Sequence, residues 1–283
     1  MEYFLRYYYY GSGGNNNRVA ELESFVMDEC KSGKIKKLDD GLKYFDQLIL
    51  ERPLPSIITF YHVLSSLSKI RCYSDVIMLY KKMNLLGVKP DISTFNILIN
   101  CCCKLVQVNH GFCLLGDIIK RGHQPNVITF TTLINGLCVQ EKIDLRSRTG
   151  KVDLALHLKN KMVNWKCSPD VVSYGLIIDT LCKGGLVDQA LVLFSEMLRD
   201  SNDIPNIVAY NSLINGLSNS GRLDEAKSFL GEMANRGIFA DVKTYNSIIH
   251  GHCLHGQWKE TRRYFDQMMD GGISQGCCRL MQW

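Results

Sequence analysis

The chain has 283 residues, of which 46% are hydrophobic and 22% are charged, a composition typical of soluble globular proteins. The formal net charge of +5 permits a polyanionic partner but does not require one. No run of about 18 apolar residues occurs, which argues against a membrane span and a membrane partner. The twelve cysteines lie in apolar helical patterns, so we expect free, mostly buried thiols in a reducing compartment.

Residues 1–32 stand apart from the rest of the chain, and we predict that they are disordered or act in targeting. Residues 1–17 read MEYFLRYYYYGSGGNNN, a tyrosine run followed by a tract rich in glycine and asparagine. A transit peptide is normally rich in arginine and serine and poor in acids. This stretch has Arg6 as its one arginine and also contains Glu2, so the targeting signal is weak.

From residue 33 onward the chain repeats itself at an interval of about 35 residues. The motif LINGL occurs at 133–137 and again at 213–217. The surrounding segments, which open with Val or Ile, start at residues 57, 92, 127, 171, 207 and 242. A companion series starts at residues 37, 72, 107, 151, 186, 222 and 257, with matching intervals. Nine extra residues are assigned to 141–149 and one lies near 201–205, both at expected turns.

Each period predicts two helices. In 222–233 the apolar residues are spaced as one face of an α-helix, at Leu223, Ala226, Phe229, Leu230 and Met233. Glycine separates the first helix of a period from the second at 185, 221 and 256, and proline precedes the next period at 90, 125, 169 and 205. The expected fold is all-α, a right-handed α-solenoid of tandem 35-residue helix-turn-helix repeats.

The expected array spans 33–276 and ends in an irregular tail at 277–283. The last copy departs from the pattern where the chain reads GGISQGCCRLMQW (271–283), which favours a truncated or frame-altered array. The array divides into a half repeat at 33–56 and repeats at 57–91, 92–126, 127–170 with its insert, 171–206, 207–241 and 242–276.

The repeat resembles the pentatricopeptide repeat over about 33–275. The resemblance rests on a V-x-T/A-Y/F-N opening, LI-x-G-L-C, G-x-L-D-E-A and a G-x-x-P-D close, clearest in 92–126 and 207–241. The regular length is similar to the P class, and LDDGLKYFDQLILERPLPSIITF (38–60) is similar to restorer-of-fertility-like members. The resemblance implies a monomer that binds single-stranded RNA and reads one base per repeat.

The resemblance also implies roles for three positions of each repeat. In the family the second residue packs on base faces, the fifth contacts the base edge, and the last completes the reading. The implied stacking residues are Ile58, Ile128, Val172 and Val208, for which packing at the helix start is the alternative. The implied base-reading residues are Tyr61 with Asp91, Asn96 with Asn126, Thr131 with Asp170, Gly175 with Asn206, Asn211 with Asp241, and Asn246. Helix capping and turn formation are the alternative roles for these polar residues.

Hydrogen-bonding chemistry gives each reader a preference. Asp only accepts and so suits the imino N–H of uracil and guanine, whereas Asn can donate and suits cytosine and adenine. In the family, Asn at position five goes with pyrimidines and Thr with purines. The repeats therefore predict N-(C/U)-G-N-U-(C/U), read 5′ to 3′ along the chain. Lys69, Lys104 and Lys183, at position thirteen, are implied phosphate contacts, with an ordinary solvated lysine face as the alternative.

Two stretches look like metal sites, CCC at 101–103 and HGHCLH at 250–255. Cys103, Cys138, Cys182 and Cys253 all fall at position twelve, where a small residue favours close helix packing. His250 and His252 fall at positions that we interpret as surface. We expect no metal or cofactor. No P-loop, nucleophile elbow or deaminase signature occurs, and we expect no enzyme activity.

The predicted function is sequence-selective binding of single-stranded RNA, which acts by occupancy in organellar RNA processing, stability or translation. The family implies mitochondria, with plastids as the alternative, and other RNA-processing proteins as further partners. Two other readings remain open. One is a protein-binding helical scaffold, and the other is a truncated repeat protein with weak or no RNA binding.

Overall fold

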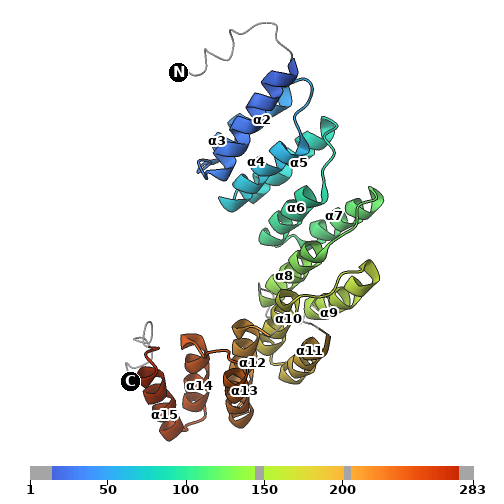
Figure 1. The fold of residues 1–283 in the computed structure, drawn as a ribbon. Coiled ribbons are helices and arrows are strands. Elements are labelled where there is room, and N and C mark those ends of the chain that lie inside the picture. The colour runs from blue at the N-terminus through green and yellow to red at the C-terminus, as the bar shows by residue number, and fades with distance from the viewer. Residues whose placement is uncertain (1–14, 144–149, 201–204, 274–283) are drawn as a thin grey trace. The chain divides into compact units, whose positions relative to one another are not determined.

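The computed structural model describes residues 15–143, 150–200 and 205–273, and within these ranges the chain is helical, without a strand (Figure 1). The first helices of the predicted repeats begin at the predicted residues. They are α4 (Ile57–Lys69), α6 (Ile92–Lys104), α8 (Val127–Ile143), α10 (Val171–Lys183), α12 (Ile207–Asn219) and α14 (Val242–Leu254). The second helices are α3 (Leu38–Leu50), α5 (Tyr73–Leu85), α7 (Val108–Lys120), α9 (Lys151–Met162), α11 (Val187–Asp200), α13 (Leu223–Asn235) and α15 (Trp258–Asp270). A short 3-10 helix, Val163–Trp165, follows α9, and α2 (Asn15–Lys31) precedes α3.

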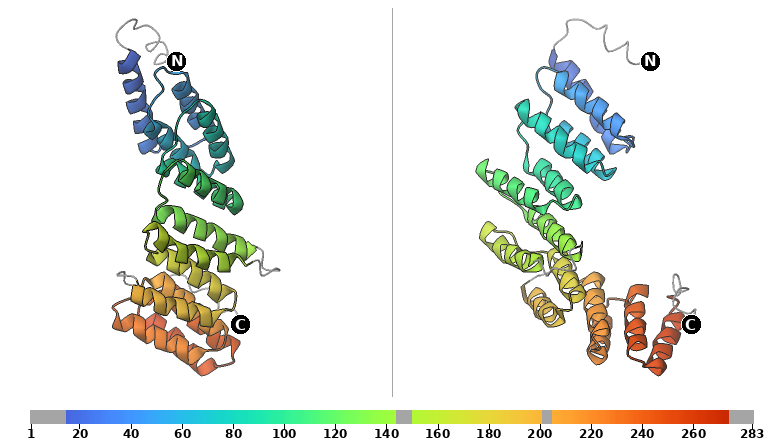
Figure 2. Two further views of the ribbon diagram at one scale, coloured as in Figure 1. Left: turned by 90° about the vertical axis from the view of Figure 1, so that its right-hand side faces the viewer. Right: turned by 180° about the vertical axis from the view of Figure 1, so that it is seen from behind.

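The chain forms two compact units, Met1–Gly136 and Leu137–Trp283. Within each unit a first helix packs against its own second helix and against the first helix of the next repeat (Figure 2). In the first unit α4 packs against α2, α3, α5 and α6, and in the second α12 packs against α10, α11, α13 and α14. This nearest-neighbour packing confirms the α-solenoid class of helix-turn-helix repeats. None of the helices in the described ranges has the length and apolar character needed to cross a membrane.

A left-handed residue turns the chain between the two helices of a repeat. Gly185 and Gly221 take φ values of 76° and 80° there, which glycine adopts without steric cost. At the same repeat position Arg71 and Val106 have φ values of 68° and 60°. A β-branched residue is strained in this conformation. The packing of the helix pair therefore imposes the turn even where the local sequence opposes it.

The glycine of LINGL allows two first helices to pack closely. A Cβ on Gly216 would lie 2.8 Å from the Cβ of Cys182, and one on Gly136 would overlap the Sγ of Cys103. In both places a glycine at position ten faces a cysteine at position twelve of the preceding repeat. The structure thus shows the close packing expected of these two cysteines.

Residues 15–31 form a helix, which differs from the disorder predicted for this part of 1–32, while the targeting role stays a prediction. The buried side chains of α2 lie on one apolar stripe that packs against α3 and α4; they are Val19, Leu22, Val26 and Cys30. The half repeat at 33–56 therefore has a first helix. Residues 1–14 and the tail at 277–283 lie outside the described residues.

The insert at 141–149 begins inside a helix rather than at a turn. Helix α8 has 17 residues, four more than α6, and so runs to Ile143. Glu141 Oε2 accepts a hydrogen bond from the backbone N–H of Lys151 at 3.0 Å, and Lys142 Nζ lies 2.7 Å from Asp179 Oδ2. These bonds stabilise the extension. Residues 144–149 and 201–204 lie outside the described residues.

Candidate nucleic-acid interface

The second residue of each first helix is exposed. The exposed fraction is 55% for Ile58, 61% for Ile128, 53% for Val172 and 57% for Val208. The two residues that follow each of them are buried, as Thr129 and Phe130 are after Ile128. Packing at the helix start, the alternative role, therefore covers only part of each side chain. Exposed, rotationally stiff apolar side chains at the same place in successive repeats offer flat contact surfaces to a ligand.

The last residue of each repeat caps the next first helix. Asp91, Asp170, Asn206 and Asp241 each accept a hydrogen bond from the backbone N–H three residues later. Asn126 does the same, since the backbone N–H of Thr129 lies 3.0 Å from its Oδ1. Capping, the alternative role, is therefore real at these positions. It uses one polar atom of each side chain, so it does not exclude a contact with a base.

In two repeats the predicted reading residues are hydrogen-bonded to each other. Asn211 Nδ2 donates to Asp241 Oδ1 at 3.0 Å, and Asn96 Nδ2 donates to Asn126 Oδ1 at 3.2 Å. Each bond joins residues 30 positions apart, on consecutive first helices. The fifth and last residues, paired in the sequence as two halves of one reader, lie side by side in both repeats.

A buried hydroxyl group completes each pair. Thr244 Oγ1 lies 2.5 Å from Asn211 Oδ1, and Thr129 Oγ1 lies 2.7 Å from Asn96 Oδ1. Both threonines are fully buried. They occupy the third position of the next repeat, to which the sequence interpretation assigned no role; the signal was the T/A of the repeat opening. We refer to the two groups as the reading clusters: Asn96, Asn126 and Thr129, and Asn211, Asp241 and Thr244.

The carboxyl group of Asp241 is held in its charged form. Burial raises its pKa, but bonds from the Thr244 backbone N–H and the Asn211 amide outweigh burial, so the pKa lies below its ordinary value. A carboxylate can only accept hydrogen bonds. The bonds from the Asn211 amide and the Thr244 backbone N–H end on Oδ1. Oδ2 takes part in neither of these two bonds, and a carboxylate oxygen has lone pairs for a further donor.

The repeat at 171–206 has an empty reading position. Gly175 contributes no side chain, and a Cβ built there would meet nothing within 4 Å. The cap residue Asn206 is present and accepts from the backbone N–H of Ala209 at 3.1 Å. Ala209 replaces the threonine of the reading clusters, so both the amide and its hydroxyl partner are missing together.

The other predicted readers have different surroundings. Asp91 accepts from Thr94 Oγ1 at 2.6 Å, while the Tyr61 ring lies edge-on to His62, with centroids 5.4 Å apart. Thr131 belongs to the first unit and Asp170 to the second. Asn246 lies in α14, and the residue predicted to complete it, Gly276, lies outside the described residues.

Glu23 occupies the place of a reading residue and was not predicted. Its Oε1 accepts from Thr59 Oγ1 at 3.2 Å and from the backbone N–H of Ser56, the residue that caps α4. Asn96 receives the equivalent hydroxyl bond from Thr129, in the next repeat. The stripe of apolar residues in 19–30 would have predicted the helix that carries Glu23, but the poor match to the repeat opening hid it.

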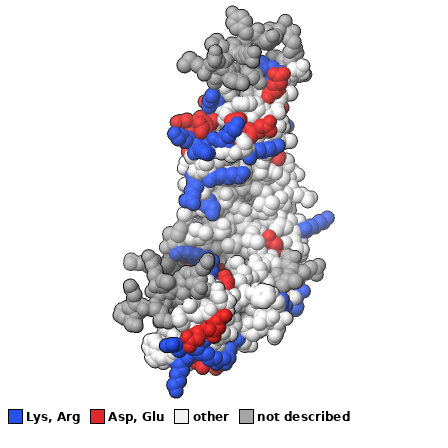
Figure 3. All heavy atoms as spheres, turned by 60° about the vertical axis from the view of Figure 1, so that its left-hand side comes forward, with Lys and Arg blue, Asp and Glu red and all other residues white. Residues whose placement is uncertain are grey.

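The three predicted phosphate contacts differ in their surroundings. Lys69, Lys104 and Lys183 are all exposed at the ends of first helices. Lys183 Nζ lies 2.9 Å from Asp179 Oδ2, which also pairs with Lys142. Figure 3 shows that Lys and Arg side chains on the face drawn lie in separate groups, some of them beside acidic ones. Lys69 and Lys104 are therefore better suited to phosphate than Lys183, whose charge is already partly balanced.

The two stretches that looked like metal sites are structural. His252 is buried, its Nδ1 lies 2.8 Å from Gln257 Oε1, and its ring stacks on Tyr264 at 5.3 Å, so its predicted surface position is wrong. The ten cysteines within the described ranges are free thiols, and burial raises the pKa of Cys103 and Cys182 to about 12. Across the described ranges, no three His, Cys, Asp or Glu side chains gather as a metal site would require.

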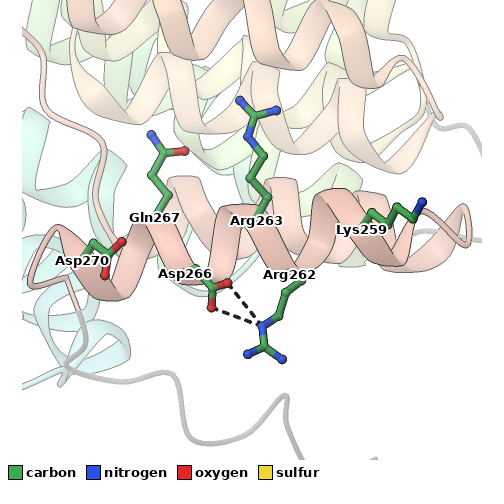
Figure 4. Close-up of a pocket in the computed structure, with 6 residues that line it drawn as sticks. All are labelled: Lys259, Arg262, Arg263, Asp266, Gln267 and Asp270. Atoms are coloured by element: carbon green, nitrogen blue, oxygen red, sulfur yellow. Dashed lines mark hydrogen bonds and ion pairs between the residues drawn. The ribbon is translucent and has the colours of Figure 1, made fainter.

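A shallow depression on α15 is open to solvent and belongs to a single helix (Figure 4). Arg262 Nε lies 3.3 Å from both carboxylate oxygens of Asp266, an exposed pair one turn apart. Such surface pairs contribute little free energy. The depression therefore offers no enclosed site; its lining residues are Lys259, Arg262, Arg263, Asp266, Gln267 and Asp270.

Comparison with known proteins identifies the repeat. The model of the PPR repeat family matches residues 55–104, 91–139 and 205–254, and two models of the PPR repeat match 165–198 and 243–273. Among curated relatives from Arabidopsis thaliana, "Pentatricopeptide repeat-containing protein At5g16640, mitochondrial" is 41% identical over 86 residues, 30% of this chain and 17% of that protein. "Pentatricopeptide repeat-containing protein At1g62680, mitochondrial" is 45% identical over 73 residues, 26% of this chain and 13% of that protein. The matched segments thus make up less than a fifth of either relative.

Solved structures show the same fold. The crystal structure of the pentatricopeptide repeat protein PPR10 from maize matches with a TM-score of 0.70 and 21% identity. The match covers 92% of this chain and 34% of the PPR10 chain. The structure of PPR10 in complex with an 18-nt psaJ RNA element matches with a TM-score of 0.66 and 20% identity. This match covers 92% of this chain and 37% of the PPR10 chain. At this identity the likeness establishes the fold.

Proposed function

This chain belongs to the PPR repeat family, and from that premise we propose that it binds single-stranded RNA and reads one base per repeat. The observation that carries the proposal is the hydrogen bond between Asn211 and Asp241, next to the exposed side chain of Val208. A polar reader and an apolar surface for stacking lie together at the start of the same helix. The RNA-bound structure of PPR10 supports the ligand class for this fold.

The base of repeat 207–241 would lie against Val208 and the aliphatic part of Lys243, the second residue of the next repeat. Its edge would meet the Asn211–Asp241 pair. Oδ2 of Asp241 would accept the imino N–H of uracil, and the remaining Nδ2 hydrogen of Asn211 would donate to a base carbonyl. Cytosine carries a lone pair instead of the imino N–H and would face a carboxylate. Uracil is therefore the preferred base.

The base of repeat 92–126 would meet two amides. Asn126 uses Oδ1 to cap α8 and to bind Asn96, which leaves its Nδ2 for a ligand. An N–H donor suits the unprotonated ring nitrogen of cytosine, and uracil can accept through its carbonyl oxygens. The proposed order N-(C/U)-G-N-U-(C/U) follows from these two clusters, from Thr131 with Asp170, and from Asn246.

We further propose that the chain is a P-class, restorer-of-fertility-like member that acts in mitochondria. The regular spacing of its repeats and the mitochondrial relatives support this assignment. It would act by occupancy, because a covered strand is shielded from nucleases and cannot fold on itself. The exposed second-position residues would also fit a peptide, so a protein-binding scaffold is the competing function.

A gel-shift experiment at two salt concentrations tests the proposal. The probes are a six-base RNA pool, the equivalent DNA pool and duplex RNA. Preference for the single-stranded RNA, weakened at the higher salt concentration, is expected because lysines neutralise phosphates. Equal binding of all three probes, or binding that ignores salt, would contradict it. The absence of binding would leave the scaffold or the weak-binding repeat protein as the better description.

A further inference from the structure

The two asparagines of the reading clusters are held in one orientation by two partners each. A free asparagine amide can rotate by half a turn, which exchanges its donor and acceptor atoms. In Asn211, Nδ2 donates to Asp241 Oδ1 and Oδ1 faces the hydroxyl of Thr244. Asn96 has the same arrangement with Asn126 and Thr129. One Nδ2 hydrogen of each asparagine is left for a ligand.

The distances assign the hydroxyl proton to the asparagine. Thr244 Oγ1 lies 2.5 Å from Asn211 Oδ1 but 3.0 Å from Asp241 Oδ1, and it also accepts from the backbone N–H of Asp241 at 3.2 Å. A hydroxyl has a single proton to donate. The shorter contact therefore receives it. In the other cluster the corresponding hydroxyl distances are 2.7 Å to Asn96 and 3.0 Å to Asn126.

Repeats without an asparagine reader use the same hydroxyl differently. Thr94 Oγ1 lies 2.6 Å from the cap carboxylate of Asp91, in a repeat pair whose reading position holds Tyr61. Where an asparagine is present, the distance from the hydroxyl to the cap residue lengthens to 3.0 Å and the short contact moves to the amide. Where Gly175 leaves no amide, Ala209 has no hydroxyl. The contact made by the third residue thus differs with the fifth residue of the repeat before it.

We propose that Thr129 and Thr244 are positioning residues for base selection. Each holds the Oδ1 atom of the preceding reader inward, so that Asn96 or Asn211 presents an N–H donor to a carbonyl oxygen of the base. The inference rests on the proposed RNA binding. Loss of the hydroxyl would remove one of the two partners that fix the amide and weaken its bias toward the N–H donor, which would admit bases that the oriented amide rejects.

The test compares three variants on RNAs that differ only in the base facing repeat 207–241. T244V removes the hydroxyl while keeping the shape, T244S keeps the hydroxyl, and T94V removes an equally buried hydroxyl that has no amide to orient. T244V should lose about fivefold of the preference for uracil over the other bases, the size expected for one hydrogen bond. T244S and T94V should keep the preference within about twofold. Urea unfolding should show that the two valine variants lose similar stability.

Two results would overturn the inference. One is T244V with its uracil preference intact. The other is a uniform loss of affinity for all RNAs in both T244V and T94V, which would mean that the hydroxyl only stabilises the helix start. Failure of the proposed function is seen separately, because the unmodified protein would then bind none of the RNAs selectively. T244S guards against misfolding, since it retains the cap and the hydroxyl together.

Discussion

Asn211 donates a hydrogen bond to Asp241 across 3.0 Å, although 30 residues separate them in the chain. The bond unites the start of α12 with the start of α14, because the last residue of one repeat is also the cap of the next. One residue therefore serves two purposes. The carboxylate that begins a helix also completes a reader, which explains why capping and reading residues coincide in the sequence.

Replacing Asn211 by Thr with Asp241 kept should change one base preference. A threonine hydroxyl is shorter than the amide and cannot reach a pyrimidine edge in the same way, and the family pairs it with purines. We expect a shift from uracil toward guanine at this position, measured by competition among four RNAs. Preferences at the other positions should stay as they are. Unchanged selectivity at the targeted position would show that the repeat register is wrong.

Gly175→Asn should add a reader to the repeat that lacks one. The site is open, since a Cβ there meets nothing within 4 Å, and Asn206 already stands at the partner position. The variant should gain preference for pyrimidines at this base, with the gain increased by adding Ala209→Thr to orient the new amide. Gly175→Ala is the matched control and should gain none. A gain in the alanine variant would point to helix stability rather than readout.

Gly216→Ala should destabilise the second unit, although alanine is the better helix former. The new Cβ would come within 2.8 Å of Cys182 Cβ, and such overpacking costs roughly 1–3 kcal/mol. Gly231→Ala is the control, because nothing lies within 4 Å of its Cβ; it should gain about 1 kcal/mol. Urea unfolding of both variants measures the difference. Equal changes would mean that the helices are not closely packed at LINGL.

Val106→Gly should stabilise the first unit. Val106 has a φ of 60°, a left-handed conformation that costs an L-residue roughly 1–2 kcal/mol and glycine almost nothing. Part of this gain is lost to the greater freedom of glycine in the unfolded chain, so about 1 kcal/mol is expected. The same change at Val139, within α8, is the control and should destabilise. Stabilisation at both sites would refute the conformational explanation.

The uracil preference of repeat 207–241 should not depend on pH between 8 and 5. Bonds from Thr244 and Asn211 hold the pKa of Asp241 below its ordinary value of 3.8, despite burial. The carboxylate therefore persists through this range, and its contribution to stability is lost only as the pH falls below the ordinary value. Measuring the preference at pH 8, 6.5 and 5 checks this. Asp241→Asn, which cannot carry the charge, should lose the preference at every pH.

The repeat length and the first-helix starts could be predicted because glycine, proline and apolar spacing recur at fixed intervals. Ile57 and Val242 both begin helices where the pattern placed them. Helix α2 was missed because it lacks the repeat opening, although its stripe of buried residues packs against α4. The extension of α8 was missed because an insert normally signals a turn, whereas tertiary bonds to Lys142 stabilise it.

The reading positions could be predicted from register, but their chemistry required three dimensions. The sequence paired Asn211 with Asp241 by counting, and the structure adds that they touch. The sequence could not indicate that Thr244 donates to Asn211, since that contact joins side chains 33 residues apart. Glu23 was hidden because its segment matches the repeat opening poorly. Hydrogen bonds between consecutive first helices depend on side-chain geometry that a one-dimensional period does not contain.

The most direct measurement of the central claim is selection of RNA from a randomised single-stranded pool by the unmodified protein, followed by sequencing. Reading of one base per repeat predicts enrichment of the ordered pattern N-(C/U)-G-N-U-(C/U), and the Asn211→Thr protein should enrich G in place of its U. A pool that emerges without positional preference, or an enriched pattern that Asn211→Thr leaves unchanged, would contradict it.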